Sequence, residues 1–502
     1  MSIQTVLFGK HLPDRATFRN PGVLTALNVI PAVPGSYGPL RELQQVASAF
    51  SARCFGAISA RDASNLVWIY AGDASKLYEL SASAVPSDQS KAGGYSLAVD
   101  DVWEFVEWNK SNLVIASNYT DAVQSIGTGL GGTTDFADLF TSTNKPKAKH
   151  LAIVGNFLFT GNTNDSTDGQ KATRVWWSAF GDPTDMDPDA ATQCDFEDLA
   201  AGGWVQKIIG GTEYGLIFQT DMVRTARYVG GSVIFDLLPI NNAPGTPLSN
   251  SVIAHKGSVY YISEHGFFAF RNGAVEPIGD GQVDRAFWNE FDILNKRALS
   301  CAVDPINKLV AWGYPGAGAS SSLPNRVRAF NWSDGRWAEW DVDHEILFRT
   351  ETQGYTLDGL DVLGTDIDDP VVFAASLDSD RYKGGALRFG AINQAHQLAF
   401  FTGATRKATI ETGDFQPQDG NLWQCDGVRP LVDGGSADIA VAARTKLQDS
   451  VTYGTASAMD ADGLCPLIRE GRYQRFRTSL TSSTSWSHFQ GIQIAYELTG
   501  ER

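Results

Sequence analysis

The sequence predicts a mainly β protein: an irregular six- or seven-bladed β-propeller followed by a smaller C-terminal β-domain. Three observations carry this prediction. Glycine contributes 50 of the 502 residues and aromatic residues 11 %, a composition that suits short strands and tight turns. Strand–turn–strand units recur at intervals of about 43 to 64 residues, a blade-sized period. Segments with helical periodicity are scarce.

Residues 1–59 are expected to form an N-terminal segment with one short helix, packed on the propeller or on a neighbouring subunit. The helix is predicted over Pro39–Phe50, where a proline stands near the first turn and apolar residues occupy positions 40, 43, 46, 47 and 50. A second short helix is expected over Gly281–Leu294.

Residues 60–401 are expected to form the propeller, and Ser258–Ile278 is its clearest unit. Val259–Ile262 and Phe267–Phe270 are aromatic and β-branched runs separated by a turn. Asn272-Gly273 then tolerates positive φ at both central positions of a hairpin, so a third strand follows. Small sheets of this kind must pack on one another, and radial packing leaves only short edges exposed. A pair of stacked sandwiches is the competing arrangement.

Other stretches repeat the strand–turn–strand plan: Leu66–Leu80, Asn112–Ile126, His150–Asp165 with Arg174–Phe180, Tyr214–Ile240, Lys308–Pro315 with Asn325–Trp332, and Pro370–Gly390. Residues 402–502 contain alternating segments between polar turns, which predicts a separate C-terminal β-rich domain.

The charge is acidic and uneven. The net charge of −17 argues against a high-affinity nucleic-acid binder, which would cluster Lys and Arg. Residues 402–502 hold 10 Lys and Arg against 12 Asp and Glu, so most of the negative charge belongs to the first 401 residues.

The cysteine content and the lengths of the apolar runs indicate in which compartment the protein is made and whether it spans a membrane. Five sparse cysteines predict buried thiols in a protein made in a reducing cytoplasm: Cys54, Cys194, Cys301, Cys425 and Cys465. No stretch of 18 apolar residues occurs, so we expect no membrane span. The N-terminal sequence has no apolar core of signal-peptide length.

The sequence motifs do not predict an enzyme active site or a cofactor-binding site. Gly127, Gly129 and Gly132 form a G-x-G-x-x-G, but the acidic residue that a dinucleotide site needs about twenty positions later is missing. The chain has no P-loop, H-E-x-x-H or G-x-S-x-G, and its seven histidines include no i, i+4 pair. We therefore predict no catalytic residues, no cofactor-binding residues and no metal ligands.

Two acidic loops, Asp182–Asp189 and Gly364–Pro370, lack the spacing of a calcium-binding EF-hand and are predicted to be turns. Asn331–Trp340 brings three tryptophans near an Asp-Gly turn. We expect a hairpin whose tryptophans pack between blades; the alternative is a sugar-stacking surface. Trp176 and Trp177, adjacent on a predicted strand, should point to opposite faces of the sheet.

Three stretches resemble one family. "FRNPGVLTALNVIPAVPGSYGPLREL" (Phe18–Leu43) resembles the opening of short-tailed bacteriophage tail proteins. "RVWWSAFGDPTDMDP" (Arg174–Pro188) and the stretch from Ser251 to Phe287 resemble two of their blades. These are turn and core signatures, and the likeness spans roughly residues 18–315.

The family comprises tail nozzles and packaged-DNA stabilisation proteins of short-tailed phages. The resemblance implies a non-enzymatic propeller subunit, six copies of which form a ring below the portal and the tail adaptor protein. Its other implied partners are tail-fibre or tail-tip needle proteins and the genomic DNA, which passes without sequence-specific binding. The expected location is the virion tail, assembled in the host cytoplasm. An acidic channel wall would keep DNA centred.

Two other functions stay open on the residues alone. One is an extracellular carbohydrate-binding or carbohydrate-active propeller, against which the missing signal peptide and sialidase-type Asp boxes argue. The other is a cytoplasmic propeller scaffold for protein partners.

Overall fold

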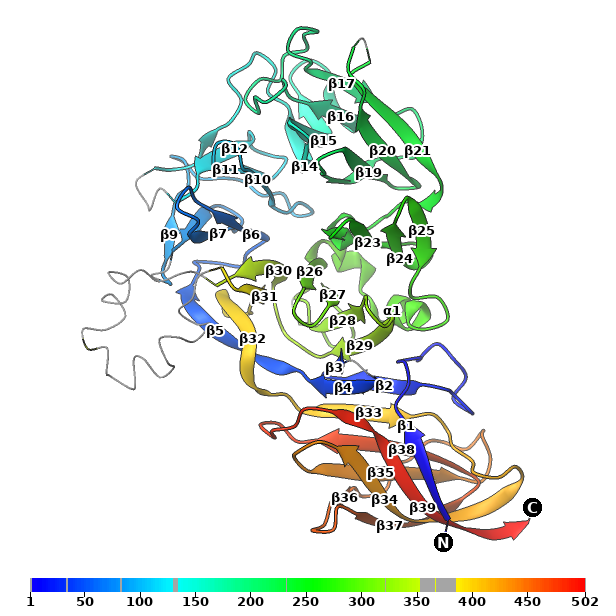
Figure 1. The fold of residues 1–502 in the computed structure, drawn as a ribbon. Coiled ribbons are helices and arrows are strands. Elements are labelled where there is room, and N and C mark those ends of the chain that lie inside the picture. Colours follow the sequence, from blue (N-terminus) through cyan, green and yellow to red (C-terminus); the bar gives the residue numbers. More distant parts are fainter. Residues whose placement is uncertain are drawn as a thin grey trace.

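The computed structural model describes residues 2–32, 35–81, 84–129, 134–231, 233–320, 322–352, 366 and 385–501. Strands dominate this part of the chain, in two bodies (Figure 1). One is a β-propeller and the other a β-sandwich that holds both chain ends.

Six four-stranded sheets and the first four strands of a nine-stranded sheet form the seven blades of the propeller, which confirms the predicted fold class and gives the number of blades. In order along the ring, blade one consists of β6 (Gly56–Arg61), β7 (Val67–Gly72), β8 (Leu77–Leu80) and β9 (Pro86–Asp88); blade two of β10 (Glu104–Trp108), β11 (Leu113–Ser117), β12 (Gln124–Gly127) and β13 (Ala137–Asp138); and blade three of β14 (Lys147–Val154), β15 (Phe157–Asp165), β16 (Gly169–Trp177) and β17 (Asp195–Asp198). Blade four consists of β18 (Val205–Ile209), β19 (Tyr214–Gln219), β20 (Met222–Tyr228) and β21 (Phe235–Pro244), and blade five of β22 (Ile253–His255), β23 (Ser258–Ser263), β24 (Gly266–Arg271) and β25 (Ala274–Pro277). Blade six consists of β26 (Ser300–Asp304), β27 (Leu309–Tyr314), β28 (Arg326–Asn331) and β29 (Arg336–Trp340), and blade seven of β30 (Ile346–Glu351), β31 (Leu387–Ile392), β32 (Gln397–Thr405) and β5 (Arg41–Ala49).

Each blade runs outward from its first strand. Neighbouring first strands contact one another around most of the ring, with β30 of blade seven against β6 of blade one, and β18 of blade four contacts the 3₁₀ turn Ser249–Ser251 that precedes blade five. A buried apolar cluster fills each of the seven spaces between neighbouring blades. Because a thin sheet cannot bury both faces alone, these shared cores hold the ring together.

The two adjacent tryptophans of β16 show how one strand serves two of these cores. Trp176 packs with Trp108 and Ile115 of blade two, whereas Trp177 packs with Ile217 and Phe235 of blade four. Each is only 3 % exposed. The prediction that they point to opposite faces is confirmed.

The Asn331–Trp340 hairpin behaves in the same way. Trp337 joins the core shared with blade five, and Trp340 joins the core shared with blade seven. Trp332 is half-buried and lies 4.8 Å from the His255 ring, centroid to centroid. Trp337 and Trp340 therefore pack between blades as expected, and the sugar-stacking alternative is wrong for these two, which are 0 % and 1 % exposed.

The helix predicted over Pro39–Phe50 is wrong, because this segment forms β5, the outer strand of blade seven. Gln44 pairs with Phe400 and Leu43 with Phe401, so a strand near the N-terminus closes the last blade. The apolar spacing suited a helical face, but the open edge of β32 offers hydrogen bonds that outweigh local preference. Within Gly281–Leu294 the expected helix is present as α1 (Asp284–Glu290). Two 3₁₀ turns, η1 (Ser249–Ser251) and η2 (Ile293–Ala298), precede strands.

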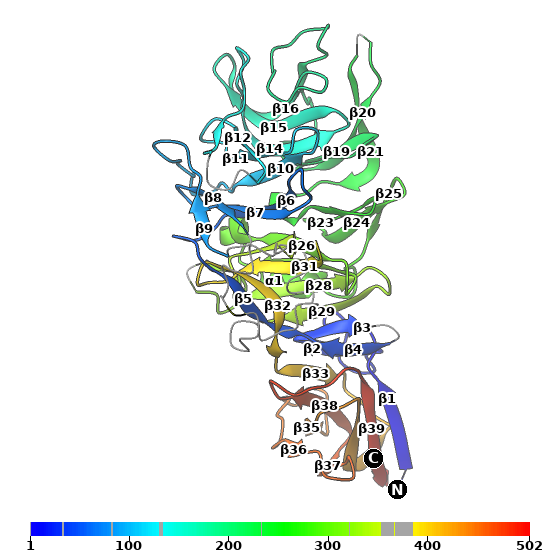
Figure 2. The same cartoon turned by 60° about the vertical axis from the view of Figure 1, so that its left-hand side comes forward.

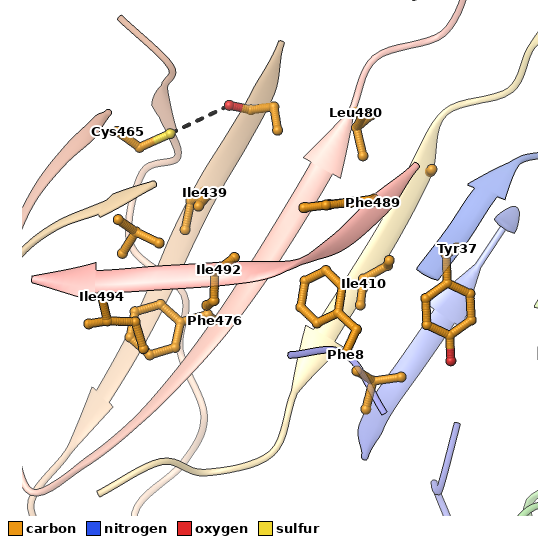
Figure 3. Close-up of a cluster of buried hydrophobic side chains, with 14 of the residues drawn as sticks. Phe8, Tyr37, Ile410, Ile439, Cys465, Phe476, Leu480, Phe489, Ile492 and Ile494 are labelled. Carbon is orange, nitrogen blue, oxygen red and sulfur yellow. Dashed lines mark hydrogen bonds between the residues drawn. The ribbon is translucent and has the colours of Figure 1, made fainter. Parts of the chain in front are cut away.

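The C-terminal residues form the sandwich together with the N-terminal segment. Its first sheet comprises β3 (Val29–Ala32), β4 (Ser36–Pro39), β39 (Phe489–Glu501), β34 (Asn421–Val432) and β37 (Cys465–Gly471), with β1 (Ser2–Leu7) paired to β39. Its second contains β2 (Val23–Leu27), β33 (Ala408–Thr412), β38 (Tyr473–Leu480), β35 (Ala437–Arg444) and β36 (Ser457–Ala458). Buried side chains from both sheets, among them Phe476 and Phe489, form one core with Phe8, which follows β1 (Figure 3).

The two bodies share a sheet. Leu27 of β2 pairs in parallel with Glu339 of β29, so blade six and the second sandwich sheet form one nine-stranded sheet. Figure 2 shows β2 and β4 between the propeller and the rest of the sandwich. Trp340 Nε1 donates to the Val29 carbonyl at 2.8 Å across this junction. The N-terminal segment was expected to pack on the propeller or on a neighbouring subunit. In the structure it supplies strands to both the propeller and the sandwich of its own chain.

All five cysteines are free thiols, and four of them are buried. Within the described ranges, no helix is long and apolar enough to cross a membrane.

Candidate functional site

An axial cavity of about 220 Å³ lies where the first strands of the blades begin. Residues from blades one, two, four, five, six and seven line it, so the ring closure itself assembles the site. Most of the residues that line it have apolar side chains, which makes the charged side chains among them informative.

Glu104 is the centre of a buried ion network that links three consecutive blades. Its carboxylate lies 3.0 Å from Lys207 Nζ and 3.1 Å from His150 Nδ1, and accepts a hydrogen bond from the Leu151 amide at 3.2 Å. Burial opposes ionisation of Glu104, but Lys207 and His150 outweigh it and lower its pKa from 4.5 to about 2. Burial lowers the pKa of His150, against the opposing effect of Glu104. The network therefore holds one carboxylate and one ammonium as a charged pair at neutral pH.

Glu345 occupies another part of the lining. It accepts a hydrogen bond from the Cys54 amide at 2.9 Å and lies 2.5 Å from His396 Nδ1. Burial is the largest influence on Glu345 and raises the pKa of its carboxyl group.

Two arginines, Arg53 and Arg297, face the same aromatic ring in this cavity. Their Cζ atoms lie 5.1 and 3.9 Å from the centroid of Phe55, a cation–π arrangement. Arg297 Nη1 donates to the Val99 carbonyl. Burial and the neighbouring Arg53 lower the pKa of Arg297 from 12.5 to about 10. Among the described residues, neither guanidinium has a carboxylate within ion-pair distance.

A wider mouth of about 350 Å³ adjoins the cavity, and Arg297 lines both. Lys149 Nζ lies 2.7 Å from Asp101 at this mouth. Trp204 and Leu294 line it as well and are 63 % and 91 % exposed. The mouth therefore combines charged side chains with exposed apolar ones.

A lateral groove of about 900 Å³ lies on blades three to five, away from the axis. Phe180 and Tyr228 both pack on Phe157, with ring centroids 5.4 and 5.6 Å away. Phe180, Tyr228 and Leu238 keep 54 %, 42 % and 55 % of their surface exposed. Such contiguous exposure marks a surface that can bind a partner.

The acidic Asp182–Asp189 loop is a series of turns, as predicted. Asp182 Oδ1 accepts from the Thr184 amide at 2.9 Å, and Asp187 accepts from the Thr143 and Asn144 amides. Of Gly364–Pro370, all but Asp366 lies outside the described residues. The described part contains no group of three His, Cys, Asp or Glu side chains placed to hold a metal ion.

No sequence motif predicts the axial site, because each blade that contributes to it supplies only one or two of its charged residues. Glu104, His150 and Lys207 lie on the first strands of blades two, three and four, but these strands carry other polar residues, so the sequence does not single the three out. Gly127 ends β12, Gly129 follows it, and Gly132 of the same G-x-G-x-x-G lies outside the described residues.

No family model matches the chain, and no curated protein matches it. Among solved structures, U3-55K is similar at 10 % identity and a TM-score of 0.38, with 64 % of this chain and 90 % of that chain covered. The RRP9 WD40 repeats follow at 11 % and 0.36, covering 63 % and 90 %. The Swd1 β-propeller domain from Myceliophteria thermophila has 8 % identity and a TM-score of 0.28, covering 49 % and 92 %. These likenesses concern the fold alone, and by its own sheets the chain is a seven-bladed β-propeller joined to a β-sandwich.

Proposed function

We propose that the chain is a structural subunit of a short-tailed phage tail, a nozzle or hub that forms a ring below the portal and adaptor. In this role it retains packaged DNA and conducts it during ejection. The observation that carries the proposal is a pair of unlike exposed apolar surfaces on one subunit, which a head-to-tail ring requires.

The first surface, the rim patch, comprises Phe180, Tyr214, Tyr228 and Leu238 at the lateral groove. These side chains come from blades three and four. Their contiguity on the outside of the propeller fits a protein–protein contact.

The second surface, the edge patch, is the outer face of β1 in the sandwich. Ile3 and Leu7 are 71 % and 66 % exposed there. Within the described residues β1 pairs only with β39, so its other edge presents free backbone groups. An open, apolar edge strand is suited to pairing with another chain.

The stretches that resemble the phage family lie where they serve architecture. Phe18–Leu43 supplies β2, β3 and β4 at the junction, Arg174–Pro188 supplies part of blade three, and Ser251–Phe287 supplies blade five and the beginning of α1. Because these stretches build the blades and the junction, their resemblance to the phage family supports a function as a structural subunit.

Assembly with the adaptor tests the proposal directly. We expect sixfold rings in electron micrographs and hexamer masses in mass photometry once the adaptor is present. Leu238→Asp should abolish the rings, because it places a charge in the rim patch. Ile306→Asp is the matched control, since Ile306 is 61 % exposed in a turn of blade six, outside the rim patch. Monomers alone with the adaptor present, or rings that survive Leu238→Asp, would contradict this assignment.

The DNA-conducting role has its own test. We expect acidic residues to outnumber basic ones on the inner wall of the mapped ring, because each phosphate contact would resist sliding. An inner wall rich in Lys and Arg would contradict the proposal that DNA slides through the channel without being held.

A carbohydrate-binding propeller is the second candidate, favoured by Phe180 and Tyr228, which are 54 % and 42 % exposed beside Glu213 and Asp236 in the lateral groove. Retention on a glycan array, lost in Tyr228→Ala, would support it over the ring.

A further inference from the structure

The axial cavity contains two cationic groups with unused hydrogen-bonding capacity. The Nε–H groups of Arg53 and Arg297 are buried and make no hydrogen bond within the described structure. Both guanidinium groups approach the Phe55 ring, which supports their planes. Partly buried cations of like charge are costly to hold close together unless an anion compensates them.

The other charged groups of the cavity are already engaged. Lys207 is paired with Glu104 at 3.0 Å. Glu345 binds the Cys54 amide and His396. The charges of Glu345 on Arg53, and of Asp100 and Asp101 on Arg297, act without an ion pair in the described structure. The two guanidinium groups are therefore the cations left to receive a ligand in the described lining.

We infer that the axial cavity binds a small oxyanion, a single phosphate group, held between Arg53 and Arg297. Guanidinium groups match phosphate oxygens in planar, two-point geometry and bind them more strongly than neutral donors do. This inference concerns the propeller axis and is independent of ring assembly.

Size and access agree with this ligand. A water molecule takes about 30 Å³, so a cavity of about 220 Å³ admits a tetrahedral oxyanion with a few waters and excludes a nucleic-acid duplex. The adjoining mouth provides the entry path, with Arg297 at the boundary.

The test is a titration of the full-length protein with inorganic phosphate at constant ionic strength, followed by calorimetry and by ³¹P NMR line broadening. We expect saturable one-site binding and a rise in melting temperature with phosphate. Arg53→Gln and Arg297→Gln should each weaken binding at least about tenfold, since each removes charge-assisted hydrogen bonds. Arg271→Gln is the control, because Arg271 is paired with Glu276 on blade five.

Two further measurements separate ligand binding from a structural role. Arg53→Gln/Arg297→Gln should melt without phosphate at the same temperature as the parent or higher, because the repulsion is gone. Arg297→Lys keeps the charge but loses the fork, and should bind with intermediate affinity. Glycerol 3-phosphate is the second probe: equal affinity assigns the site to a phosphoryl group on a larger molecule, and a strong preference for inorganic phosphate assigns it to the free ion. Absence of saturable binding, or equal binding by the double variant, would overturn the inference.

Discussion

Asn28 and Asp341 exchange two hydrogen bonds at the junction of the sandwich and the propeller. Asn28 Nδ2 donates to Asp341 Oδ1 at 2.6 Å, and the Asp341 amide donates to Asn28 Oδ1 at 3.0 Å. Asn28 also donates to the Lys407 carbonyl at 3.0 Å, is 4 % exposed, and has a φ of 56°. One side chain thus ties the N-terminal segment to the end of blade six and to the linker into β33.

We predict that Asn28→Ala destabilises the protein by about 3 kcal/mol, because it strands buried partners and places alanine at positive φ. Urea unfolding monitored by tryptophan fluorescence measures the change. Asn272→Ala is the control for strain alone, since Asn272 has a φ of 51° in an exposed turn. Its cost should be about 1 kcal/mol. Equal costs for the two variants would show that the junction hydrogen bonds add nothing.

Breaking the Glu104 network should cost more than breaking a surface pair. Glu104→Gln leaves Lys207 without its buried counter-charge, so we expect a loss of about 3 kcal/mol in the free energy of unfolding. Glu104→Leu/Lys207→Met removes both charges and should recover most of that loss. The exposed pair Lys76–Asp88, 2.7 Å apart, is the reference. Asp88→Asn should cost less than about 1 kcal/mol by the same denaturation assay.

Acid should destabilise the propeller through His344. Its Nδ1 bonds the Val342 carbonyl at 2.8 Å, its Nε2 is buried without a partner, and burial lowers its pKa from 6.5 to about 4. Above pH 6.5 the stability is complete; between pH 6.5 and about 4 the unfolded chain takes up a proton that the folded protein resists, so stability falls.

His344→Gln should therefore flatten the decline between pH 7 and pH 4 by about 3 kcal/mol. Thermal melts in a series of buffers give the profile. His265→Gln, at an exposed turn, serves as the control and should leave the slope unchanged. An unaltered slope in His344→Gln would refute the assignment of the proton to this ring. His11, also buried with a pKa lowered to about 4, adds to the same decline.

The N-terminal strands should be required for folding. Deleting residues 1–49 removes β5 from blade seven, β2 from the shared sheet, and β1, β3 and β4 from the sandwich. We expect this deletion to yield aggregated or protease-sensitive protein, because it exposes the edges of β32, β33 and β39. Deletion of residues 1–7 removes β1 alone and should leave a soluble fold. Limited proteolysis and size-exclusion chromatography compare the two; a soluble, compact product from the longer deletion would contradict the prediction.

Local patterning could predict the blades but not their closure. In Ser258–Ile278, strand residues and the Asn-Gly turn are neighbours in sequence, and β23, β24 and β25 pair as expected. Pro39–Phe50 failed because its partner, β32, lies some 350 residues away. β5 is an edge strand with mostly exposed side chains, so no period of two reveals it.

The axial site could not be predicted from the sequence for a related reason. Arg53, Glu104, Lys207 and Arg297 are far apart in sequence, and only the ring order of the blades brings them to one cavity. A sequence shows that a strand contains an unexpected charge, whereas the partner of that charge depends on which blades become neighbours.

The pairing of β1 with β39 has a consequence for synthesis on the ribosome. Leu7 pairs with Gly491 and Ser2 with Tyr496, so β1 waits until β39 has been translated, roughly half a minute to a minute and a half at elongation rates of about 5–20 residues per second. Throughout that interval β1 has no strand to pair with, so the first sandwich sheet is completed only after β39 has been synthesised.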